Sequence, residues 1–149
     1  MIVGVPKEVK NNENRVGLTP NSVKLLSELG HSIFVQSQAG DAIGFSDDLY
    51  LSSGATILQD VEEVFASSDL IIKVKEPVDG ELQYLREGLG LFTYLHLAGN
   101  LPQAKKLLET GVTGIAYETV TAIDGSLPLL APMSAIAGQL SMVVGSYHL

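Results

Sequence analysis

Three side chains in the sequence have the chemistry of a site that binds a small acid and transfers protons, and each follows a short apolar run. Arginine has a planar fork that matches a carboxylate, and lysine neutralises or polarises an oxygen beside it. Histidine is the side chain best suited to proton transfer near neutral pH. The three residues are Arg15, Lys75 and His96. Together they predict a site for a small oxo acid or an amino acid.

Each of these residues also has an ordinary structural explanation. Arg15 fits a surface arginine, and Lys75 fits an ion pair with Glu76 or Glu118. His96 fits a hydrogen-bonded histidine at the end of a strand. The functional explanation gains weight only if the fold brings all three residues to one edge of a sheet.

The elements that must position these residues alternate between strand and helix. Helices are predicted to follow Thr19, Asp60 and Asn100, which can cap a first turn, and Gly30 and Gly111 end two of them. Strands are predicted at residues 2–5, 32–36, 69–74, 91–95 and 112–117. The alternation predicts an α/β fold with a mainly parallel sheet and helices on both faces, a three-layer Rossmann-like or flavodoxin-like arrangement. Ligands bind such sheets at the carboxyl ends of the strands, where the three residues occur.

The last fifth of the chain, from about residue 119, has a different character. An Asp-Gly pair at 124–125 predicts a small β-hairpin near residues 119–130. Residues 125–149 contain no charged side chain among Asp, Glu, Lys and Arg. A membrane span is one explanation of such a run, but two prolines, a glutamine and a histidine interrupt it. We favour a long helix starting near Pro132, with protein covering nearly every side.

The composition restricts the partners. The 149 residues carry a net charge of −8 with scattered lysines and arginines, so the basic stripe that nucleic acid requires is absent. There is no cysteine for a disulfide or a thiolate metal site, and the three histidines lack metal-ligand spacing. Gly88-Leu89-Gly90 precedes a strand and lacks the third glycine of a dinucleotide fingerprint. The N-terminus shows no secretory signal, so we expect a cytoplasmic protein without a membrane partner.

Four separated motifs resemble the alanine dehydrogenase family, which also includes nicotinamide nucleotide transhydrogenase. The similarity covers the whole chain. It reaches the end through Pro132-Met133-Ser134 and the helix that follows, in which Ser134, Gly138, Ser141 and Gly145 place small side chains along one face. The four motifs are Val5-Pro6-Lys7-Glu8, Asn14-Arg15-Val16-Gly17-Leu18-Thr19-Pro20, Lys73-Val74-Lys75-Glu76-Pro77 and Phe92-Thr93-Tyr94-Leu95-His96-Leu97-Ala98.

The resemblance implies an oxidoreductase that uses NAD to convert L-alanine and water to pyruvate and ammonia. Arg15 and Lys75 match the residues that hold the substrate carboxylate and carbonyl, and His96 matches the general acid and base. Met133 matches a position near the substrate, and Ser134 matches one that touches the nucleotide. Water addition and collapse to the ketone need such a proton shuttle and fixed positive charge.

The resemblance also predicts the domain organisation. Residues 1–131 correspond to a substrate-binding domain, and residues 132–149 to the start of an interdomain helix. The family's glycine-rich NAD-binding domain is absent from these residues, so we expect the isolated chain to be inactive. The uncharged helix predicts a homo-oligomer, because an exposed apolar strip of that length tends to find a partner.

Two alternatives remain open. One is a domain like that of the transhydrogenase α subunit, a relative that typically lacks both the histidine and the lysine. The other is a non-enzymatic module that associates with full-length subunits through its last helix. Both His96 and Lys75 are present here, which favours the dehydrogenase.

Overall fold

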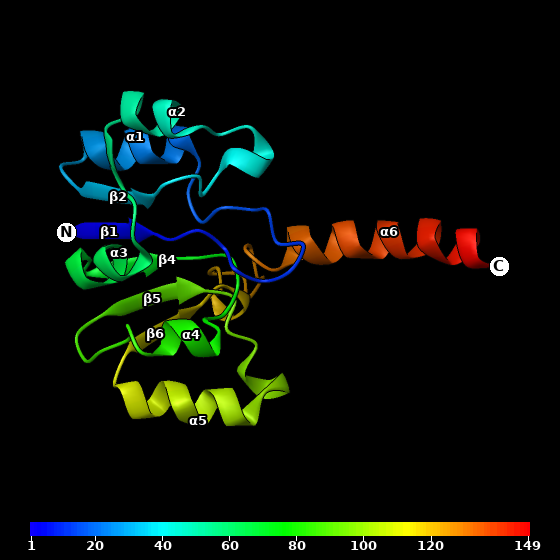
Figure 1. Cartoon of the computed structure of the whole chain (residues 1–149). Helices are drawn as coiled ribbons and strands as arrows, with labels where there is room; N and C mark the ends of the chain where they lie inside the picture. The colour runs from blue at the N-terminus through cyan, green and yellow to red at the C-terminus, as the bar shows by residue number, and fades with distance from the viewer.

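The computed structural model describes the backbone of all 149 residues and every side chain except that of Asp79. In these described residues, six parallel strands form one sheet in the order β3-β2-β1-β4-β5-β6 (Figure 1). The strands are β1 (Ile2–Val5), β2 (Ser32–Gln36), β3 (Ala55–Leu58), β4 (Leu70–Ile72), β5 (Gly90–Thr93) and β6 (Thr113–Ala116). This order is that of a doubly wound, Rossmann-like sheet, and the direction of winding reverses between β1 and β4. The predicted fold class is confirmed.

The helices begin and end largely where the local signals predict. Helix α1 (Pro20–Glu28) starts after Thr19, whose hydroxyl accepts a hydrogen bond from the backbone of Ser22. Helix α5 (Leu101–Thr110) starts after Asn100 and ends at Gly111, which has a left-handed φ of 71°. Helix α3 (Val61–Ser67) follows Asp60, although that side chain makes no capping hydrogen bond. The remaining short helices are α2 (Asp47–Ser52), α4 (Asp79–Leu82) and the 3₁₀ turns Asp41–Ile43, Leu97–Gly99 and Tyr117–Thr119.

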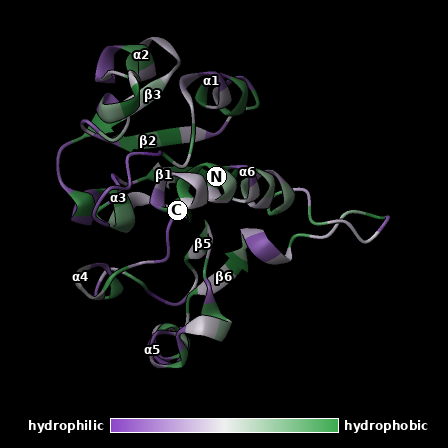
Figure 2. Ribbon diagram, turned by 90° about the vertical axis from the view of Figure 1, so that its right-hand side faces the viewer, coloured by the Kyte–Doolittle hydropathy of each residue, from purple (hydrophilic) through white to green (hydrophobic). Residues whose placement is uncertain are grey.

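Helices cover both faces of the sheet, as Figure 2 shows with α1 on one side and α3, α4 and α5 on the other. Val23 of α1 packs into one buried cluster with residues of β1 and β2, while Phe65 of α3 and Leu107 of α5 belong to a second. In β4, Ile71 faces the second cluster and Ile72 faces the first, because successive side chains of a strand point to opposite faces. The result is the three-layer arrangement that the alternation of elements predicts.

Two predictions about elements need correction. Strand β3 and the preceding α2 were not predicted, since β3 has only four residues and Thr56 interrupts its apolar run. The β-hairpin predicted near residues 119–130 does not form. A tight turn is present, with Gly125 at φ 83° and a hydrogen bond from the Ala122 N–H to the Ser126 carbonyl. The flanking residues do not pair as strands, because they are exposed and a two-stranded hairpin needs something to pack against.

Helix α6 (Ala131–His148) extends away from the sheet on the side towards which the strand arrows point (Figure 1). None of its residues is buried, and Leu140, Val143 and Val144 are each more than half exposed. Within the described residues, no helix combines the length and the hydropathy needed to cross a membrane.

Candidate functional site

The carboxyl ends of β1 and β4 meet at the point where the winding of the sheet reverses, and this is where such sheets bind ligands. Gly4 of β1 pairs with Ile71 of β4, so the loops that follow the two strands are neighbours. The first loop carries Arg15 and the second carries Lys75. His96 follows β5, the next strand of the sheet. Strand order therefore brings all three predicted residues to one rim.

Arg15 is held by a neighbouring acid and by α6. Glu13 accepts hydrogen bonds from its Nε at 2.8 Å and from its Nη2 at 2.6 Å, while Nη1 lies 3.1 Å from the sulfur of Met133. The hydrogen bond from Arg15 lowers the pKa of the Glu13 carboxyl, against the opposing effect of burial. The structure thus brings Arg15 and Met133 together. Two of the guanidinium nitrogens are already paired, and Nη1 faces only a weak acceptor that a carboxylate can replace.

Lys75 presents an unpaired ammonium. Among the side chains that the structure describes, its Nζ makes no hydrogen bond or ion pair, so the ion pairs considered for it are not formed. Glu76 pairs with Lys10 instead, and Glu118 accepts hydrogen bonds from backbone N–H groups. A free ammonium beside the Glu13–Arg15 pair is suited to an anionic or carbonyl oxygen.

His96 has an exposed side chain on a strained backbone. Its φ of 50° lies in the left-handed region, which costs a residue other than glycine about 1–2 kcal/mol. The carboxylate of Glu118 holds this conformation by accepting hydrogen bonds from the backbone N–H of His96 at 2.6 Å and of Leu95 at 3.1 Å. The ring of Tyr94 stacks on the imidazole, with the ring centres 6.0 Å apart. Strain maintained in this way is typical of functional positions.

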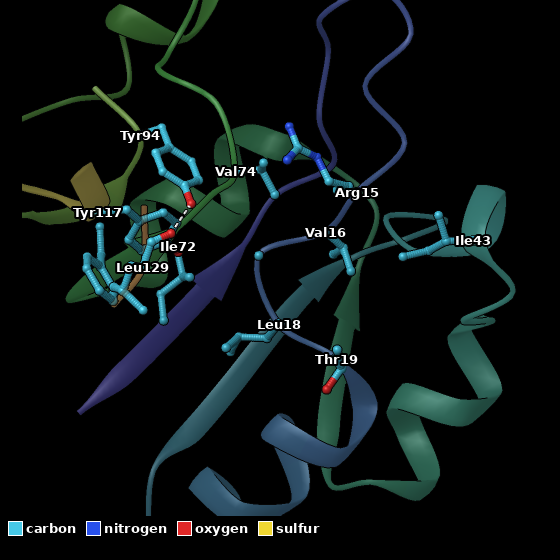
Figure 3. Close-up of a pocket in the computed structure, with 12 residues that line it drawn as sticks. Arg15, Val16, Leu18, Thr19, Ile43, Ile72, Val74, Tyr94, Tyr117 and Leu129 are labelled. Atoms are coloured by element: carbon cyan, nitrogen blue, oxygen red, sulfur yellow. Dashed lines mark hydrogen bonds between the residues drawn. The ribbon is translucent and has the colours of Figure 1, made fainter. Parts of the chain in front are cut away.

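An apolar cavity of about 480 Å³ has Arg15 and Tyr94 among its lining residues (Figure 3). Arg15 and Tyr94 lie at one end of it, and the Tyr94 hydroxyl donates a hydrogen bond to the Leu129 carbonyl at 2.6 Å. Tyr117 packs edge-on against Tyr94, and burial raises the pKa of the Tyr117 hydroxyl, so Tyr117 remains a neutral phenol.

The sequence did not reveal this cavity or the contacts that Tyr94 and Glu118 make with His96. The only signal was that both lie at or just beyond a strand end.

Ser134 lies in the first turn of α6, next to Met133. Its backbone N–H donates to the Leu130 carbonyl at 3.1 Å, so this N–H group is already used within the helix. The exposed hydroxyl is what remains for a ligand. No group of three or more metal-ligating side chains occurs in the described part of the chain.

Gly17 fixes the distance between the Arg15 loop and β4. A Cβ at this position would lie 2.4 Å from the Ile72 carbonyl oxygen, which is backbone and cannot rotate away. We expect Gly17→Ala to push the loop off the sheet, to destabilise the protein by about 1–3 kcal/mol and to weaken anion binding at Arg15. Urea denaturation measures the loss of stability. Gly80→Ala is the matched control, because a Cβ there meets nothing within 4 Å, and an equal loss in the two variants would contradict the explanation.

A doubly wound parallel sheet with cationic side chains at its switch point defines an α/β domain suited to binding a small anion. The chain belongs to the alanine dehydrogenase/PNT N-terminal domain family, whose model matches residues 4–137. It is 48% identical to the alanine dehydrogenase of Mycolicibacterium smegmatis over all of its 149 residues, which are 40% of that relative. The chain therefore spans about two fifths of the length of the curated relatives it matches.

Solved structures agree with this assignment. An L-alanine dehydrogenase superposes on 97% of the chain with a TM-score of 0.91 and 47% identity, using 40% of that structure. A transhydrogenase from Sinorhizobium meliloti superposes on 83% of the chain, and 36% of its own, with a TM-score of 0.76 and 29% identity. The transhydrogenase is the more distant of these two neighbours.

Proposed function

We propose that this chain is the substrate-binding part of an NAD-dependent L-alanine dehydrogenase. The reaction is L-alanine, NAD⁺ and water going to pyruvate, ammonium, NADH and a proton. The observation that carries the proposal is the convergence of Arg15, Lys75 and His96 on the rim at the switch point. The similarity to alanine dehydrogenases along the whole chain supports it.

Each residue receives a role from its position. Arg15 binds the substrate carboxylate through the nitrogen that now faces Met133, and Lys75 polarises the oxygen on the reacting carbon. His96 transfers protons as water adds to the iminium of the substrate and the adduct collapses to the ketone. Met133 lies against Arg15 and closes the site on the α6 side.

The sheet itself does not fit NAD. In a dinucleotide-binding sheet, a short glycine-rich turn after the first strand presents a helix N-terminus to the pyrophosphate. Here the first turn of α1 is capped by Thr19, and residues 6–18 separate it from β1. NAD accepts the hydride in the reaction, and we propose that another part of the enzyme holds it, with the Ser134 hydroxyl as a contact from this chain. Residues 1–131 then form the substrate-binding domain, and residues 132–149 lead away from it.

Titration with pyruvate tests the proposed function directly. We expect the NMR signals of Arg15, Lys75 and His96 to shift together, and Arg15→Ala to weaken binding about tenfold or more, because a charge-assisted hydrogen bond is lost. Lys24→Ala removes an exposed lysine from α1, outside the site, and serves as the control. Shifts confined to another face, or an Arg15→Ala chain that binds normally, would contradict the proposal.

We also propose that α6 mediates association with a second copy of the chain. Its exposed apolar residues support this, since large apolar surfaces tend to be covered by a partner. Sedimentation of the wild-type chain is expected to show a concentration-dependent oligomer, and Val143→Glu should shift it towards monomer. Lys24→Glu changes charge elsewhere and should leave the oligomer intact. A wild-type monomer at high concentration would refute self-association.

A further inference from the structure

The loop that carries Lys75 is anchored by buried charges. It follows β4 and begins at Lys73, whose side chain is completely buried between two carboxylates. The Nζ of Lys73 lies 2.5 Å from Glu81 Oε1 and 3.6 Å from Glu8 Oε2. The side chains of Glu8 and Glu81 are only 2% and 5% exposed. The proposed catalytic chemistry uses none of these three residues.

The two carboxylates hold different parts of the loop. Glu8 Oε1 accepts hydrogen bonds from the backbone N–H of Val74 at 2.6 Å and of Lys75 at 3.3 Å. Glu81 Oε2 accepts one from the N–H of Val78 at 2.9 Å. Glu8 therefore fixes the backbone at Lys75 itself, whereas Glu81 fixes the far end of the loop.

Glu8 also belongs to the loop that leads from β1 to Arg15. Its carboxylate thus connects the two loops of the switch point, each of which supplies one cation to the site. Because the ammonium of Lys75 has no partner among the described side chains, its position depends on the backbone that Glu8 holds. Replacing a buried ion pair with apolar residues is often neutral or stabilising, so stability alone gives little reason for this cluster.

We propose that Glu8 is a positioning residue, which sets Lys75 relative to Arg15 so that both can engage one small carboxylate. The inference rests on the proposed function. A positioning role for Glu8 differs from a general structural role because it predicts an effect on pyruvate binding that depends on the presence of Lys75.

The test compares pyruvate dissociation constants, measured by NMR titration, for variants of the 149-residue chain. Glu8→Asp keeps a negative charge for Lys73 but withdraws the carboxylate by about one methylene, roughly 1.5 Å, which breaks the bond to Val74. We expect its binding to weaken about tenfold, while Glu8→Gln retains length and an acceptor and stays within about threefold of wild type. Glu81→Gln is the matched control. It removes a carboxylate from the same lysine without touching Val74 or Lys75, and its binding should be unchanged.

A double-mutant cycle shows whether Glu8 acts through Lys75. In a Lys75→Ala background, Glu8→Asp should have no further effect on pyruvate binding, because the group it positions is gone. Equal weakening in both backgrounds would overturn the inference, and so would normal binding by Glu8→Asp. A wild-type chain that binds no pyruvate would overturn the proposed function and this inference with it. If wild type binds and only the Glu8 result fails, the proposed function stands.

Hydrogen exchange in the wild-type chain gives a second measurement should Glu8→Asp fail to fold. Coupling between two equilibria is reciprocal, so pyruvate must stabilise the contact that assists its binding. Saturating pyruvate should slow exchange of the Val74 and Lys75 amides several-fold more than that of the Val78 amide. Equal changes at the three amides would overturn the inference.

Discussion

Replacing His96 with alanine is expected to lower kcat about 100-fold or more in an alanine dehydrogenase that contains this chain, the usual scale for loss of a general acid and base. The imidazole of His96 is exposed at the rim and stacks on the ring of Tyr94, and the carboxylate of Glu118 holds the His96 backbone. Steady-state kinetics of alanine oxidation and of the reverse reaction measure the effect. Arg15→Ala should instead act mainly on KM, because a carboxylate contact holds the ground state and the transition state alike.

His31→Ala is the control for the first prediction, since this histidine lies between α1 and β2, outside the site. It should leave kcat near the wild-type value. A His96→Ala enzyme that remains fully active in alanine oxidation would remove the acid–base role of His96.

The 149 residues by themselves are expected not to oxidise alanine. Hydride transfer requires the nicotinamide ring to be held against the substrate carbon, and positioning of that kind is worth on the order of 7 kcal/mol or more of the barrier, about 10⁵ in rate. The connection between β1 and α1 is not the short glycine-rich turn of a dinucleotide-binding sheet. NADH formation followed by absorbance checks this directly.

Joining the chain to the nucleotide-binding domain of an alanine dehydrogenase should restore the activity. The joined protein carrying His96→Ala separates the two predictions, because it holds the cofactor but lacks the proton shuttle. Robust NAD-dependent alanine oxidation by the 149-residue chain would show that the second prediction is wrong.

Local signals predicted most of the elements, and the exceptions have physical causes. Thr19 and Asn100 cap their helices as expected, since a cap needs only residues adjacent in the chain. Strand β3 was not predicted because it has only four residues and Thr56 interrupts its apolar run. The turn at Gly125 formed without its hairpin, because a turn is local whereas strand pairing needs a packed face.

The sequence by itself determined the alternation of strands and helices, and with it the prediction that Arg15, Lys75 and His96 lie at strand ends. Only the tertiary structure decided what surrounds them. Glu8 and Glu118 were visible as acids that follow strands, yet each proved to be an acceptor for the backbone of a neighbouring loop. Those contacts join residues 66 and 22 positions apart in the chain. They depend on which strands are neighbours and in what register, and periodicity along the chain carries no information about either.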